Sequence, residues 1–202
     1  MIINQREIQA LDQRYRTMFI NSLAGFRQAV LVGTKSLHDQ TNLAIFNSLI
    51  HLGADPALFG LISRPDTVQR DTLQNMIDTK EFSLNFVKSD IYKKAHQTSA
   101  RYPKGVSEFD KTGFKAVYED GFSVPFVENA VVKIAMKYEE SILIPLNGTV
   151  LIVGSILQVC IDDQLVGEDG FVNLSASKVL ISQGLDAYFI SQELGRLPYA
   201  KP

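Results

Sequence analysis

The chain has 202 residues, of which 46% are hydrophobic and 21% charged, and its formal net charge is −2. This composition is typical of a globular domain with a sizeable core, and the charge gives no general attraction to nucleic acid or to an anionic membrane. No run approaches the ~18 apolar residues of a membrane-spanning helix, and the N-terminus lacks the features of a signal peptide. We therefore expect one domain over residues 1–202 in the cytoplasm, with neither nucleic acid nor membrane as a partner.

The sequence contains few residues suited to metal or thiol chemistry. Cys160 is the only cysteine, which excludes an internal disulfide and favours a reducing compartment. It lies at an alternating position of a strand-like run, so we expect a buried, small side chain rather than a reactive thiol. The histidines, His38, His51 and His96, are far apart and lack carboxylates or cysteines at ligand spacing, which predicts no metal site. The motifs of serine hydrolases, P-loop proteins and Rossmann folds are also absent from the sequence.

The first part of the chain reads as a helix followed by strands. Apolar residues at helical spacing predict one amphipathic helix over residues 5–23. Strands are expected at 29–33, 42–49 and 57–62. In the second of these, alternation predicts Leu43, Ile45 and Leu49 on one face.

The rest of the chain predicts further strands with a few helices. Asp71 resembles a helix N-cap, with Gln74 completing a capping box, and this helix should end near residue 80. We expect a strand at 81–87, a short helix at 91–100, a loop at 104–114, and then strands at 130–138, 148–162 and 171–174. Together these elements predict a mainly β fold with peripheral helices (α+β), closed as a β-barrel.

A first group of polar residues is suited to an anion. If a helix begins at Asp71, Thr72 and Asn75 lie three positions apart on one face, near exposed N–H groups and the positive end of the helix dipole. Arg64 follows a strand and supplies a forked donor that suits a phosphate. The same residues also suit an ordinary helix start beside a solvated loop arginine, and the spacing alone favours neither interpretation.

A second group of polar residues, Asn42, Asn47 and Ser48, lies in and after the strand-like run. Small polar side chains and backbone groups at a strand end supply donors and acceptors for the edge of a flat heterocycle. Taken alone, a turn in which Asn and Ser make local hydrogen bonds is the simpler interpretation.

The order of short motifs along the chain is more specific than any one of them. The motifs are VLVGT, N-L-A-x-F-N-S, D-P-A-L, S-R-P, D-T-L-x-N and E-F-x-x-N, followed by VSEFDKTGF, PFVENA and TVLIVGSILQV. Over residues 24–164 this succession resembles the flavin reductase-like family, whose members bind FMN in a split β-barrel. The resemblance favours the phosphate interpretation of the first group.

The resemblance also implies roles for particular residues. It implies that the isoalloxazine ring meets Asn47, Ser48 and Leu49, with Thr34 and Asn42 nearby. It implies that the phosphate or ribityl chain is held by Arg64, Thr72 and Asn75. It further implies a homodimer with each FMN in a groove near the subunit interface.

The activity implied by the resemblance is hydride transfer from NADH or NADPH to flavin, which the flavin itself performs. No catalytic side chain is identified, and for His51 and His96 a partly buried structural role is the simpler expectation. Two alternatives remain open: an FMN-carrying electron-transfer protein that a partner reduces, and a barrel that has lost its flavin.

Overall fold

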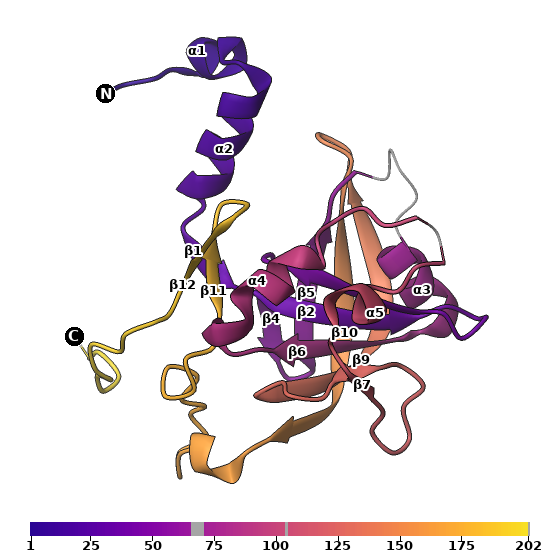
Figure 1. Ribbon diagram of the computed structural model, residues 1–202. Coiled ribbons are helices and arrows are strands. Elements are labelled where there is room, and N and C mark those ends of the chain that lie inside the picture. Colours follow the sequence, from indigo (N-terminus) through magenta and orange to yellow (C-terminus); the bar gives the residue numbers. More distant parts are fainter. Residues whose placement is uncertain (66–70, 104, 202) are drawn as a thin grey trace.

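A seven-stranded antiparallel sheet forms the body of the protein in the computed structural model, which describes residues 1–65, 71–103 and 105–201. Its strands lie in the order β3-β2-β6-β9-β10-β5-β4 (Figure 1). Their bounds are β2 Val30–Lys35, β3 Thr41–Phe46, β4 Ile50–Ala54, β5 Ala57–Ser63, β6 Glu81–Phe86, β9 Val132–Ile144 and β10 Thr149–Ile161. The prediction of a mainly β fold with peripheral helices is confirmed.

The two edge strands of this sheet, β3 and β4, are joined by residues 47–49. This short link brings the two edges of the sheet together, although no ladder pairs β3 with β4. Instead, the Ser48 hydroxyl donates to the carbonyl of Ile62 on β5 (3.1 Å) and accepts from its N–H (3.0 Å). The sheet is therefore curled into a barrel that is left split between β3 and β4.

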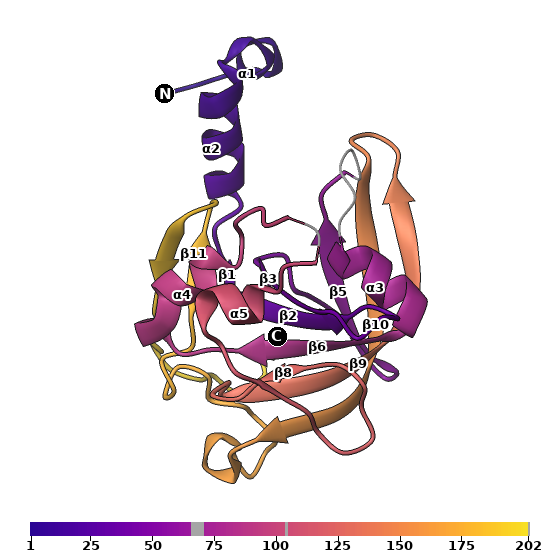
Figure 2. The same cartoon turned by 45° about the vertical axis from the view of Figure 1, so that its right-hand side comes forward.

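Smaller elements surround the barrel. A three-stranded sheet has the order β1-β11-β12, and β7 pairs with β8. Figure 2 shows α4 and α5 on one side of the barrel, and α3 contacts β2 and β3. The bounds are β1 Phe26–Gln28, β7 Ala116–Val117, β8 Phe126–Val127, β11 Ile181–Gln183, β12 Ala187–Phe189, α3 Asp71–Thr79, α4 Tyr92–Gln97, α5 Glu108–Thr112, η1 Ser89–Ile91 and η2 Asp163–Leu165.

The N-terminal segment is an arm of two helices, α1 (Gln5–Ala10) and α2 (Gln13–Leu23), and not the single helix that we expected. The break occurs because the Asp12 carboxylate accepts hydrogen bonds from the N–H groups of Arg14 and Tyr15 and so starts a second helix. Figures 1 and 2 show the arm standing away from the barrel, and neither helix has a buried residue.

Two apolar clusters form the core. One includes Phe82, Met136 and Ile152, and the other lies under α4 and α5 around Leu31, Leu43 and Phe109. Ile45 packs against the second cluster with Leu43, but Leu49 packs against the first. The expectation that all three share one face is wrong because β3 ends at Phe46 and the chain bends at residues 47–49.

Several strands differ from the sequence-based expectation. The expected strand at 171–174 contributes only an isolated bridge between Val166 and Val172. The strands β1, β4, β7, β8, β11 and β12 are additional, and α5 lies within the expected loop 104–114. Cys160 is exposed, so the prediction of a buried side chain is wrong. It lies near the end of β10, where the four residues 157–160 are exposed.

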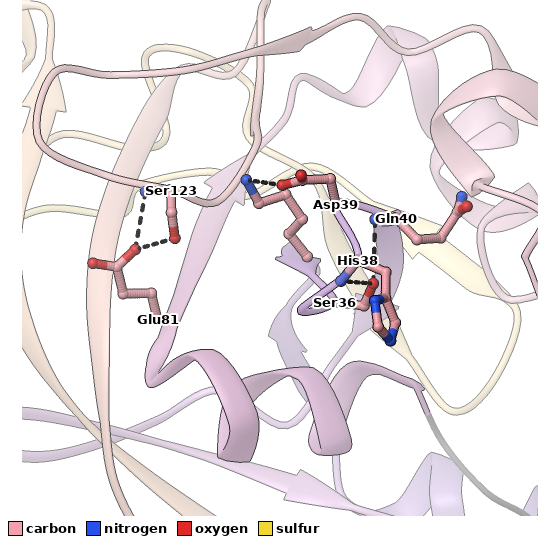
Figure 3. Close-up of polar contacts among 7 residues, drawn as sticks. Ser36, His38, Asp39, Gln40, Glu81 and Ser123 are labelled. Atoms are coloured by element: carbon pink, nitrogen blue, oxygen red, sulfur yellow. Dashed lines mark hydrogen bonds and ion pairs between the residues drawn. The ribbon is translucent and has the colours of Figure 1, made fainter.

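Polar contacts fix the turn between β2 and β3 and the start of β6 (Figure 3). In the turn between β2 and β3, the Ser36 hydroxyl accepts from the N–H groups of His38 and Gln40 (both 3.2 Å). At the start of β6, the Glu81 carboxylate accepts from the N–H (3.0 Å) and hydroxyl (2.7 Å) of Ser123. These contacts hold the ends of β2 and β6 in place. None of the described helices is long and apolar enough to span a membrane.

Candidate functional site

Four of the predicted site residues form a hydrogen-bonded cluster between the barrel and α3. Thr34 and Asn42 face each other in the register of β2 and β3. The Asn42 amide nitrogen donates to the hydroxyls of Thr34 (3.3 Å) and Thr72 (2.9 Å), and the Asn75 amide nitrogen donates to Thr34 (3.1 Å). Thr34, Thr72 and Asn75 are buried. Thr72 and Asn75 share one face of α3, as their spacing predicts.

The bonding pattern leaves this cluster with spare donors. In each of its three bonds an amide nitrogen donates and a threonine hydroxyl accepts. The hydroxyl proton of Thr72 therefore remains available, and Thr72 lies in the first turn of α3, where backbone N–H groups lack intrahelical acceptors. A set of donors at a helix N-terminus fits a phosphate.

The start of α3 differs from the predicted capping box. Asp71 is the first helical residue, and the preceding position lies outside the described residues. The Gln74 side chain donates to Asp78 (2.8 Å) within the exposed face of the helix. The N-cap assignment is wrong, but the first turn of the helix lies where it was expected.

A carboxylate that the sequence analysis missed lies beside the cluster. One Glu108 carboxylate oxygen accepts from the N–H of Leu43 (3.0 Å), the residue after Asn42. Burial raises the pKa of Glu108, and the charge of Asp71 adds to this shift. Glu108 thus provides the hydrogen-bond acceptor for the Leu43 N–H on the edge strand β3, and this bond joins α5 to the barrel. Only the long-range fold shows this contact, since residues 43 and 108 are far apart in sequence.

The residues expected at the flavin ring make specific structural contacts. Asn47 donates from its amide nitrogen to the carbonyl of Gly184 (2.7 Å), in the turn between β11 and β12. Its amide oxygen accepts no hydrogen bond among the described residues and is open to solvent. Ser48 is committed to Ile62 of β5, and Leu49 packs against the first core cluster.

Arg64 lies two residues beyond Ile62 and is exposed. It joins none of the ion pairs of the described residues, and the segment from 66 to 70, which leads to α3, is outside the description. The structure thus places Arg64 close in sequence to the Ser48 contact but shows no bond to the cluster.

His51 and His96 are both exposed. The ring of His51 packs edge-on against Phe59, with centroids 6.3 Å apart. His96 shares a hydrogen bond between its Nδ1 and the Tyr188 hydroxyl (2.8 Å). Burial raises the pKa of Tyr188 to about 12, and Asp186 adds to this shift. The expectation of partly buried histidines is wrong. Within the described ranges, no group of three acidic, His or Cys residues is placed to hold a metal ion.

The comparisons with known proteins agree with this architecture. Residues 24–175 match the family model described as the flavin reductase like domain, and the chain therefore belongs to this family. A protein of Shewanella frigidimarina, described as a candidate flavin reductase with a split barrel domain, is 44% identical over 99% of this chain and 100% of its own, with a TM-score of 0.95. The fold is thus the split barrel that the resemblance implied.

More distant relatives share the fold. Component B of nitrilotriacetate monooxygenase from Bacillus cereus is 19% identical, with a TM-score of 0.85 over 98% of both chains. An FMN-binding protein from Thermus thermophilus is 20% identical, with a TM-score of 0.71 over 88% of this chain and 93% of its own. An uncharacterized protein of Aquifex aeolicus is 27% identical over 70% of this chain and 72% of its own.

Proposed function

We propose that the chain binds FMN and transfers hydride from NADH or NADPH to it, as a flavin reductase. The observation that carries this proposal is the cluster of Thr34, Asn42, Thr72 and Asn75 at the first turn of α3, in a chain of the flavin reductase-like family. Its spare donors suit the phosphate of FMN, and the positive charge of Arg64 adds to them.

The predicted ring site lies along β3 from this cluster. Asn42 and Asn47 are five residues apart, which is about 16 Å along an extended strand. This arrangement suits an elongated ligand with an anionic end at Thr72 and a ring at residues 47–49. The amide nitrogen of Asn47 donates to the Gly184 carbonyl, so the side-chain oxygen remains free to accept a hydrogen bond from a ring N–H.

Bound flavin would supply the hydride chemistry, and the protein would hold and orient it. Asn47 would accept a hydrogen bond from the ring edge, while Ser48 would keep the 47–49 segment against β5 through Ile62. Arg64, Thr72 and Asn75 would bind the phosphate and ribityl chain. The reaction would take place in a reducing, cytoplasmic setting, where the exposed Cys160 remains a thiol.

A homodimer is part of the proposal. The helices α1 and α2 have no buried residue, and α2 exposes Tyr15, Ile20 and Leu23. Isolated helices of this length are marginal in water, since most helical stability in proteins comes from packing. A second copy of the chain would supply the missing packing surface. Light scattering on purified protein should give the mass of a dimer, and a monomeric mass would contradict this part of the proposal.

The activity is tested by visible absorption spectra of the protein with FMN, first alone and then anaerobically with NADH or NADPH. Perturbed flavin bands that bleach with either nucleotide are the expected result and identify the donor. Bound flavin that stays oxidised would replace the reductase with an FMN carrier reduced by another protein. Unperturbed bands at all concentrations would overturn the proposal and leave a barrel without flavin.

A further inference from the structure

A cavity of about 500 Å³ lies between α4 and the three-stranded sheet. Its lining includes Tyr92 of α4, Tyr188 and Phe189 of β12, and Asp186. Small-molecule sites usually have volumes of roughly 300–1,000 Å³. The cavity is open to solvent, because Tyr92 and Phe189 are each 40% exposed. It is therefore large and accessible enough to hold a small organic molecule.

The walls of the cavity carry aromatic rings in fixed positions. The ring centroids of Tyr92 and Tyr188 lie 5.8 Å apart, and the Tyr188 hydroxyl is hydrogen-bonded to Nδ1 of His96 (2.8 Å). The ring of Phe189 packs edge-on against Phe26 of β1, with centroids 4.9 Å apart. Because the face of an aromatic ring is electron-rich, these rings favour a positively charged ligand over a negatively charged one.

Asp186 is the charged residue of the lining. It is exposed and takes part in none of the ion pairs among the described residues. Burial raises the pKa of Tyr188 to about 12, and the charge of Asp186 adds to this shift, as expected for a carboxylate on the same side of the cavity. Since no lysine or arginine of the described residues lines the cavity, Asp186 gives it a net negative charge.

A carboxylate among aromatic faces attracts an organic cation through both charge and cation–π interactions. Lys93 illustrates this preference, because its ammonium group lies 5.9 Å from the centroid of the Tyr92 ring, although Lys93 does not line the cavity. Within the described ranges, no cation lies over the ring of Tyr188 or Phe189. These rings and Asp186 are therefore available to a ligand.

We propose that this cavity binds a small organic cation, whose ammonium group lies against Asp186 and the rings of Tyr92 and Tyr188. The cavity shares the turn between β11 and β12 with the predicted ring end of the flavin site. Gly184 accepts from Asn47 (2.7 Å) at the start of this turn, and Asp186 lines the cavity at its end. The inference goes beyond the proposed function and does not depend on it.

The test measures binding by the full-length protein without FMN, in ligand-observed NMR titrations. Three probes that share one aromatic ring are compared: benzyltrimethylammonium, the neutral benzyl alcohol and the anion benzoate. The variants are Asp186→Asn, Tyr92→Leu and Tyr92→Phe. Asp90→Asn is the matched control, because Asp90 is an exposed acid two residues before Tyr92 that does not line the cavity.

We expect the wild type to bind benzyltrimethylammonium more tightly than benzyl alcohol, and benzoate most weakly. The affinity for the cation should fall about threefold to fivefold in Asp186→Asn, as for an exposed ion pair, and by a similar factor in Tyr92→Leu, which removes a ring face. It should be unchanged in Asp90→Asn and nearly unchanged in Tyr92→Phe, which keeps the ring.

No binding of the cation, or equal affinities of the wild type for the cation and for benzyl alcohol, would overturn the site. An equal affinity of the wild type and Asp186→Asn for the cation would overturn it as well, as would an equal loss in Asp90→Asn. Should Tyr92→Leu fail to fold, Asp186→Asn decides the question, because Asp186 is exposed. Failure of the proposed function would be recognised separately, because a protein that binds no FMN can still bind the cation.

Discussion

Thr34 is the centre of the polar cluster, and replacing it tests whether the cluster stabilises the fold. The Thr34→Val substitution exchanges the hydroxyl for a methyl group of similar size at a position that is 0% exposed. It removes the acceptor of two hydrogen bonds, from Asn42 and Asn75. At about 0.5–1.5 kcal/mol for each neutral bond, the free energy of unfolding should fall by about 1–3 kcal/mol.

A double-mutant cycle separates the bond from other effects of the substitution. Urea unfolding, followed by circular dichroism on the flavin-free protein, is measured for the wild type, Thr34→Val, Asn75→Ala and the double variant. In the valine background Asn75 has already lost its bond to residue 34, so Asn75→Ala should cost about 1 kcal/mol less than in the wild type. Thr34→Ser keeps the hydroxyl, so Asn75→Ala should cost as much in the serine background as in the wild type. Costs that add within ~0.3 kcal/mol would show that Thr34 and Asn75 do not interact.

Three further outcomes follow from the contacts of the site. Arg64→Ala should weaken FMN binding by about 1.5–3 kcal/mol in a calorimetric titration, since a bond to a charged group is lost; an unchanged dissociation constant would show that Arg64 does not reach the ligand. Ser48→Ala should lower the free energy of unfolding by about 1–3 kcal/mol, because the hydroxyl both donates to and accepts from Ile62; a stability equal to the wild type would show that the contact is dispensable. Burial raises the folded-state pKa of Glu108 above its ordinary value of 4.5, so its contribution to stability is present below pH 4.5 and lost as the pH rises through the folded-state pKa. The stability of the wild type relative to Glu108→Gln, measured by urea unfolding between pH 4 and 7, should therefore fall as the pH rises, and a difference that is constant with pH would contradict the shift.

The parts of the fold that could be predicted from the sequence are those set by local patterns. The 3.6-residue period places Thr72 and Asn75 on one face of α3, and the strong β pattern locates β9 and β10, although β9 begins and ends later than expected and β10 is slightly shorter. The break between α1 and α2 has a local cause in Asp12, an N-cap residue that the helical periodicity concealed. The short hairpin of β11 and β12 was missed because each strand has only three residues.

The contacts that assemble the site depend on long-range register. Thr34 and Asn42 meet because β2 and β3 pair in one particular register, and Glu108 reaches Leu43 only once α5 is packed on the barrel. The pairing of β1 with β11 spans most of the chain. No local pattern specifies such pairings. The sequence therefore predicts which residues belong to the cluster but not their hydrogen-bond partners.

The proposed function requires that the donors at α3, together with Arg64, bind the phosphate of FMN. Its most direct test compares the affinities of the flavin-free protein for FMN and for riboflavin, which has the same ring and ribityl chain but no phosphate, in the wild type and in Arg64→Ala. We expect much tighter binding of FMN than of riboflavin by the wild type, with a smaller difference in the variant. Equal affinities of the wild type for the two flavins would contradict it.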